Sequence, residues 1–212
     1  MTEDTLADLA RLRAIAEEGR RMPLLGGRHL ILWGAVVALA SSLHGALVAD
    51  LLPLPMIAAA FFWFGLTAAA AFIGRSLPMI RHMRGAGNDV GNRVERSVWQ
   101  MGGALLWLTG LGILAAAYWH LHQTGKPDLF LLFTMMPPLT FGVYAIALRV
   151  SAEAASLPQL KPYALISLGF VPVTLLLAGS VWQFGAMAVG VLLVSVLPGR
   201  MMLALEKGQA NG

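Results

Sequence analysis

Residues 29–49 have the sequence HLILWGAVVALASSLHGALVA, which contains no Asp, Glu, Lys or Arg. A helix of about 20 apolar residues, rising about 1.5 Å per residue, is long enough to cross a bilayer. Five more apolar stretches without a charged residue follow along the chain. They are residues 55–74, 98–119, 129–148, 163–179 and 182–199. The sequence therefore predicts an all-α fold, a polytopic membrane helical bundle of about six transmembrane helices.

The overall composition also indicates a membrane protein. Of the 212 residues, 58% are hydrophobic and 12% are charged, whereas a soluble domain carries about 25% charged residues. The chain contains no cysteine, which excludes disulfides and thiolate metal sites. We expect one six-span transmembrane domain over residues 25–203, between a cytoplasmic segment at 1–24 and a cytoplasmic tail at 204–212.

The lysines and arginines flank the apolar stretches on alternate sides of the predicted membrane. Fourteen of the 15 fall on one side, and only Lys126 falls on the other. The positive-inside rule places the richer side in the cytoplasm. The sequence thus predicts a multi-pass protein of a bacterial-type inner (plasma) membrane, with both termini cytoplasmic (N-in/C-in). Because the basic residues follow the membrane boundaries, we expect no nucleic-acid partner.

The last apolar run, residues 163–199, is interrupted only around Gly179 and Ser180. It predicts two short spans joined by a tight turn at those residues. The alternative is one long kinked helix, which would place Arg200 and Lys207 on the side with few basic residues and contradict the charge pattern.

The N-terminal segment, residues 1–24, has the apolar spacing of a helix. Leu6, Leu9, Leu12 and Ala16 recur three or four residues apart. Acidic residues lie early in the segment and arginines late, which suits the helix macrodipole. We expect a short amphipathic helix on the cytoplasmic membrane surface. The alternative is a docking helix for a cytoplasmic partner.

Pairs of small residues recur four positions apart in several stretches, which puts both members on one helix face and lets helices approach closely. The pairs are Gly34 with Ala38, Gly65 with Ala69, Gly112 with Ala116, and Ala186 with Gly190. They fit either packing within one bundle or a homo-oligomer interface, and the sequence leaves both open.

The fourth stretch carries Pro137 and Pro138 in its middle, directly after Met135 and Met136. Proline has no backbone N–H and disfavours helix in the residue before it, so two in succession should kink or break the helix. The carbonyls freed near residues 133–134 then need partners inside the bundle. Broken helices mark binding sites in many transporters, which makes this region a candidate solute site.

Two histidines fall at similar depth in the predicted membrane: His44 towards the outer end of the first stretch, and His120 at the end of the third. Imidazole binds metals and haem, and a methionine thioether would add a soft ligand. The spacing fits no ligand motif, however, and histidines at helix ends are commonly structural. We therefore predict no metal and no cofactor. The candidate ligand region is His44, His120, Met135, Pro137 and Pro138.

The second cytoplasmic loop is basic through Arg81, Arg84, Arg93 and Arg96. These arginines would contact anionic lipid headgroups or an acidic protein partner. After the loop, Asn92 followed by Glu95 resembles a helix-capping arrangement that would start the third span at about Arg93.

The chain shows none of the paired carboxylates, metal-ligand clusters or nucleophile arrangements that enzymes display. Ion-coupled transport is also disfavoured, because it usually needs charged residues within the spans. We therefore expect a non-enzymatic scaffold or regulatory subunit that acts by interaction. The alternative is a small transporter or channel for an uncharged or lipophilic solute. A lipid-modifying enzyme that uses the histidines is the weakest interpretation. The sequence leaves the partner, the solute and the oligomeric state open.

Overall fold

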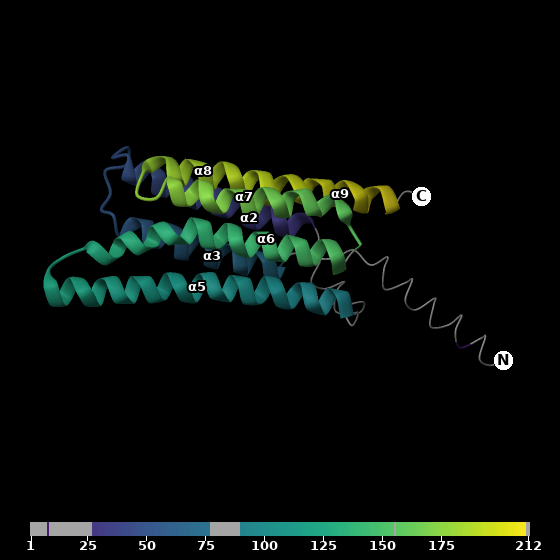
Figure 1. Ribbon diagram of the computed structural model, residues 1–212, viewed down its shortest axis with the longest axis horizontal. Helices are drawn as coiled ribbons and strands as arrows, with labels where there is room; N and C mark the ends of the chain where they lie inside the picture. Colours follow the sequence, from purple (N-terminus) through teal and green to yellow (C-terminus); the bar gives the residue numbers. More distant parts are fainter. Residues whose placement is uncertain (1–7, 9–26, 77–89, 155, 211–212) are drawn as a thin grey trace.

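The computed structural model describes residues 8, 27–76, 90–154 and 156–210. The regular secondary structure in these residues is helical, and the helices lie side by side along the long axis of the molecule (Figure 1). The elements in chain order are α2 (Gly27–Val48), α3 (Ala58–Ser76), α5 (Val90–Thr124), the 3-10 helix η1 (Asp128–Met135), α6 (Met136–Ala154), the 3-10 helix η2 (Pro158–Leu160), α7 (Lys161–Leu176), α8 (Val181–Val191), the π-helical segment η3 (Leu192–Val196) and α9 (Leu197–Ala210).

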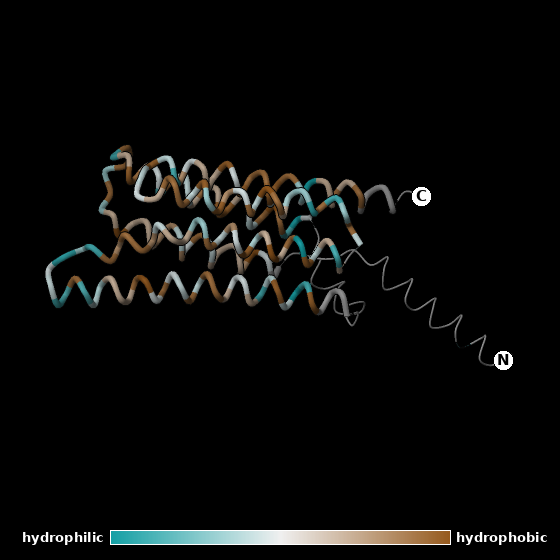
Figure 2. The backbone as a smooth tube through the Cα atoms, viewed as in Figure 1, coloured by the Kyte–Doolittle hydropathy of each residue, from teal (hydrophilic) through white to brown (hydrophobic). Residues whose placement is uncertain are grey.

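Five helical segments are long and apolar enough to cross a membrane. They are Gly27–Val48, Val94–Thr124, Asp128–Ala154, Pro158–Leu176 and Val181–Leu205. The apolar part of α3, Ala58–Gly74, is shorter than these five. Hydrophilic residues gather towards the two ends of the molecule, and most of the length between them is apolar (Figure 2). The protein is therefore a multi-pass helical membrane protein by helix length and hydropathy.

The last apolar run folds as the predicted hairpin. α7 ends at Leu176 and α8 begins at Val181, with a turn between them. Gly179 takes a positive φ of 80° in this turn, a conformation that glycine adopts without strain. The alternative of one long kinked helix is wrong.

α2 packs antiparallel against the continuous helix formed by α8, η3 and α9. Gly27 lies against the Gly199 backbone, and a β-carbon built on Gly34 would lie 2.8 Å from Ser195 Cβ. Ser195 Oγ donates a hydrogen bond to the carbonyl of Leu30 at 2.7 Å. Small residues thus let these two helices meet almost backbone to backbone, as helices in membranes often do.

α6 and α7 form a second closely packed pair. The rings of Phe141 and Phe170 stack with centroids 4.9 Å apart. Ser167 Oγ donates to the carbonyl of Phe141 at 2.8 Å. Gly190 of α8 leaves room for both phenylalanine rings, so this pair is joined to the α2–α8 pair.

α3 and α5 lie at the periphery, with α3 packed on α2 and α5 on α6 and η1. They meet through the rings of Phe64 and Trp107, whose centroids are 5.2 Å apart. Only 11% of the most apolar part of α5 is buried within the protein, against 44% for the last helix. Most of α5 therefore faces lipid or another molecule.

The start of the third span differs from the sequence prediction. α5 begins at Val90, so Asn92 is inside the helix and the predicted cap and start at Arg93 are wrong. The side chain of Glu95 accepts a hydrogen bond from Ser151 of α6, a contact between helices that the sequence prediction did not include. The predicted amphipathic helix at 1–24 lies outside the described residues, apart from Asp8.

Candidate functional site

The two prolines of the fourth stretch lie where a 3-10 helix becomes an α-helix. η1 ends at Met135 and α6 begins at Met136, so Pro137 and Pro138 stand in the first turn of α6. A first helical turn tolerates proline because its N–H groups have no partner within the helix. The predicted break is therefore a change of helix type, and the helical path of the chain continues through it.

The prolines determine which backbone carbonyls find a partner. The carbonyl of Phe133 accepts a bond from the N–H of Met136, because Pro137 has no N–H to form the α-helical bond. The carbonyl of Thr134 would bond residue 137 in a 3-10 helix or residue 138 in an α-helix, and both are prolines. Thr134 therefore needs a donor from elsewhere in the bundle, as the sequence predicts for carbonyls near residues 133–134.

Gln183 supplies that donor. Its Nε2 donates to the carbonyl of Thr134 at 2.7 Å and to the carbonyl of Thr174 at 3.0 Å. Thr174 lies in the last turn of α7, where carbonyls have no helical donor. One fully buried carboxamide thus ties η1, α7 and α8 together. We call Thr134, Pro137, Pro138, Thr174 and Gln183 the proline–glutamine junction.

The other end of the same carboxamide has no partner. Gln183 Oε1 is the one buried side-chain polar atom in the described residues without a hydrogen bond. Sequence reasoning missed Gln183, although an amide inside an apolar stretch is a signal. Gln100 carries the same signal and is exposed, so the sequence alone does not choose between them.

His44 lies beside the junction. Its ring is 4.1 Å from that of Phe184, the neighbour of Gln183 in the sequence. Trp63 Nε1 donates to His44 Nδ1 at 3.1 Å. A neutral imidazole that accepts at Nδ1 carries its proton on Nε2, so neither nitrogen offers a free lone pair to a metal while this bond is present.

The other candidate ligands do not form a recognisable metal site. His120 is half-buried near the end of α5, and its carbonyl accepts a bond from Thr124 Oγ1 at 2.8 Å. Met135 is exposed at the end of η1. In the part of the chain that the structure describes, no three His, Asp or Glu side chains gather around a common point.

A buried polar chain links α5 to α6 at the opposite end of the molecule from the junction. Trp99 Nε1 donates to Ser151 Oγ at 3.2 Å, and Ser151 Oγ donates to Glu95 Oε1 at 2.9 Å. Glu95 is only 2% exposed, which is unusual for a carboxylate. No sequence pattern predicts this burial, because Glu95 lies three residues before the third apolar stretch.

Basic residues gather at this same end, which we call the basic end. Its cluster of Leu30, Ala152, Leu160 and Met202 brings α2, α6, η2 and α9 together. The described basic side chains at these helix ends are Arg28, Arg96, Arg149, Lys161 and Arg200. Of the predicted basic-loop contacts, Arg96 is exposed on α5; Arg93 is in α5 but its side chain is not described, and Arg81 and Arg84 lie outside the described residues.

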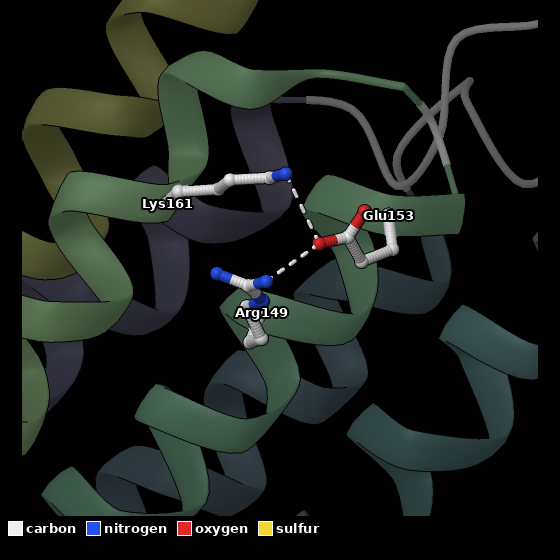
Figure 3. A network of polar contacts seen from close by, with 3 residues as sticks. All are labelled: Arg149, Glu153 and Lys161. Carbon is white, nitrogen blue, oxygen red and sulfur yellow. Dashed lines mark ion pairs between the residues drawn. The ribbon is translucent and has the colours of Figure 1, made fainter.

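One acidic residue at the basic end holds two of these cations. Arg149 Nη2 and Lys161 Nζ lie 2.9 Å and 3.1 Å from the same oxygen, Oε1 of Glu153 (Figure 3). The network joins the end of α6 to the start of α7. All three side chains are more than one-third exposed, so the pairs contribute little to stability.

The small-residue pairs divide into two classes. Gly34 and Gly190 are buried against other helices of the bundle. Gly65 and Gly112 are exposed, and no described atom lies within 4 Å of a β-carbon built on either one. Their partners Ala69 and Ala116 are exposed too. Packing within the bundle therefore accounts for two pairs and leaves one pair on α3 and one on α5 facing outward.

The chain matches no protein-family model, no curated protein and no solved structure. A functional proposal therefore rests on the contacts of this chain alone.

Proposed function

We propose that the protein is a non-enzymatic scaffold or interaction subunit of a bacterial-type inner membrane, which binds another membrane protein through the outward faces of α3 and α5. The observation that carries the proposal is the outward pair of small residues on each helix, Gly65 with Ala69 and Gly112 with Ala116. In lipid, such pairs are the usual contact surface of a second helix. The bundle uses its other two pairs in this way.

The proposal includes six spans and cytoplasmic termini. Lys126 lies in the α5–η1 connection, at the opposite end from Arg149, Lys161 and Arg200. An excess of basic residues on one side supports a cytoplasmic location for that side. The basic end would then meet anionic headgroups or a cytoplasmic partner.

Cysteine cross-linking tests the proposed faces, because the chain contains no cysteine of its own. Gly112→Cys and Gly65→Cys place a thiol on each face. Gly169→Cys on α7 is the matched control, since Gly169 is also exposed with no described atom near its β-carbon position. Cross-linking in the native membrane, followed by mass spectrometry, identifies what lies against each thiol.

We expect adducts with one defined membrane protein at position 65 or 112 and none at 169. An adduct of twice the chain mass would assign the face to self-association and reject a separate partner. Equal, unselective adducts at all three positions would show that lipid covers these faces and would contradict the proposal.

A second candidate function is passage of a small uncharged solute at the proline–glutamine junction. The unpaired Oε1 of buried Gln183 favours it, because an acceptor at this depth suits a hydroxyl-bearing solute. Against it, the Thr134 carbonyl is already bonded within the protein. Glycerol uptake by proteoliposomes tests this candidate. Uptake should exceed that of protein-free liposomes and fall in Gln183→Leu, and equal uptake would reject transport of this solute class.

A further inference from the structure

We propose that a groove between α5 and α6 at the basic end binds the headgroup of a phospholipid that carries a primary amine. In this site Arg149 contacts the phosphate, Glu153 contacts the ammonium, and Val94 with Val150 contacts the first part of the acyl chains. The inference rests on the groove itself and does not depend on the proposed scaffold function.

The groove is shallow and open, and its size and lining suit part of a lipid. Its volume is about 430 Å³, and Val94, Arg149, Val150, Glu153 and Ala154 line it. Sites for small ligands commonly hold about 300–1,000 Å³. Val94 is 45% exposed, so an apolar floor is open to the surroundings, and in a membrane acyl chains fill such a surface.

The groove also lies at the right depth. Arg149 and Glu153 are in the last turns of α6, which ends at Ala154. Lys161 is the first residue of α7. Headgroups lie where transmembrane helices end. The charged rim is therefore at headgroup level. Val150 follows Arg149 directly and Val94 precedes Glu95, whose side chain bonds to Ser151, so both valines lie at the level of the charges and offer apolar surface to the part of the lipid next to its headgroup.

The two rim charges favour an amine headgroup over an anionic one. Both ion pairs of Glu153 with described residues use Oε1, so no described cation pairs with its second carboxylate oxygen, and a lipid ammonium would contact that oxygen. Arg149 uses one nitrogen in the pair with Glu153, and a guanidinium has further N–H donors for a phosphate. A headgroup with phosphate and ammonium matches both charges, whereas a headgroup without an amine leaves Glu153 without a contact.

The Lys161 side chain also contacts the Glu153 carboxylate. It lies 3.1 Å from Glu153 Oε1, on the side of the carboxylate that faces α7 (Figure 3). Lys161 therefore holds Glu153 from one side and leaves the lipid ammonium the other oxygen. An exposed pair of this kind opens at little cost, so the network can rearrange when the lipid binds.

The test is native mass spectrometry of the delipidated full-length protein in detergent. Phosphatidylethanolamine and phosphatidylglycerol with identical acyl chains are added in parallel titrations. We expect tighter binding of phosphatidylethanolamine, and Glu153→Gln should weaken it about two- to fivefold, the worth of one exposed ion pair. The same variant should leave phosphatidylglycerol binding unchanged or strengthen it. Arg149→Gln should weaken the binding of both lipids.

Two further variants keep the test decisive. Val94→Trp fills the groove floor without changing a charge, and it should weaken both lipids. Lys126→Gln removes a charge from the opposite end and should change neither. Equal binding of the two lipids by the wild type would overturn the proposal. Phosphatidylethanolamine affinity that is unchanged in both Glu153→Gln and Val94→Trp would overturn it as well.

Discussion

Gln183 supports three helices through one amide group. Each of its two N–H bonds ends on a carbonyl that lacks a helical donor: Thr134 because of the prolines, and Thr174 because α7 ends there. In a membrane interior no water is present to donate a hydrogen bond to an unsatisfied carbonyl. The side chain therefore stabilises the bundle by completing the backbone hydrogen bonding of other elements.

Replacing this side chain should lower the stability of the bundle. In Gln183→Leu both carbonyls lose their donor, and we expect the free energy of unfolding to fall by about 1–3 kcal/mol. The loss of the unpaired Oε1 offsets part of this cost. SDS titration of the purified protein measures the change, with Gln100→Leu, an exposed glutamine on α5, as the control. Equal stability of the two variants would contradict the structural role of Gln183.

Ser151 has a comparable role between α5 and α6. It accepts from Trp99 and donates to buried Glu95, so Ser151→Ala leaves both partners with one bond fewer. We expect a loss of about 1–3 kcal/mol, the range for hydrogen bonds to charged groups, together with a shift in tryptophan emission. Ser97→Ala, at an exposed position of α5, should show neither effect. An unshifted spectrum for Ser151→Ala would mean that the Trp99 contact is absent in the membrane.

At the scale of elements, the contact between α2 and the last helix depends on glycines. A methyl group at Gly34 would lie within 2.9 Å of atoms of both Ser195 and Val196. Gly34→Ala should therefore destabilise the protein by about 1–3 kcal/mol through overpacking. Gly169→Ala should be neutral or slightly stabilising, because alanine is the better helix former and no described atom is near its β-carbon. Thermal unfolding in detergent compares the two, and equal melting temperatures would argue against this close approach.

The elements also show how far the sequence can be interpreted without the structure. Charge-free stretches predict the helices, because a bilayer admits only segments that bond their own backbone. They do not predict that Gln183 meets Thr134, since that contact depends on which helices become neighbours. The burial of Glu95 was missed for the same reason. The sequence also does not predict which glycines are buried. Gly34 and Gly112 have similar apolar neighbours in the sequence, but Gly34 is buried in the bundle and Gly112 is exposed.

At the scale of the whole molecule, cysteines placed in three exposed connections would report the orientation of the protein in the membrane. We expect Leu51→Cys and Lys126→Cys to react with a membrane-impermeant maleimide on intact cells whose outer membrane has been opened. Gln159→Cys, in the η2 connection, should react only after the inner membrane is permeabilised. The excess of basic residues at the end that contains Gln159 is the physical reason.

The same labelling decides whether α3 crosses the membrane. Positions 51 and 126 are separated by two helices, α3 and α5. If both positions are external and α5 crosses, α3 must cross as well. Labelling of position 51 from the outside and 126 only after permeabilisation would instead leave α3 on the membrane surface and give five spans.

The unequal lengths of the helices affect the bilayer itself. The charge-free stretch of α5, residues 98–119, has 22 residues and extends about 33 Å at the usual helical rise. The apolar part of α3, Ala58–Gly74, extends only about 26 Å on the same basis. If α3 crosses the membrane, a flat hydrocarbon layer of about 30 Å is slightly thinner than the stretch on α5 and slightly thicker than that on α3. A small tilt of α5 and a slight thinning of the lipid around α3 would then match both. A thicker bilayer would then reduce the mismatch at α5 and increase the mismatch at α3, so that bilayer thickness acts on the two faces in opposite directions.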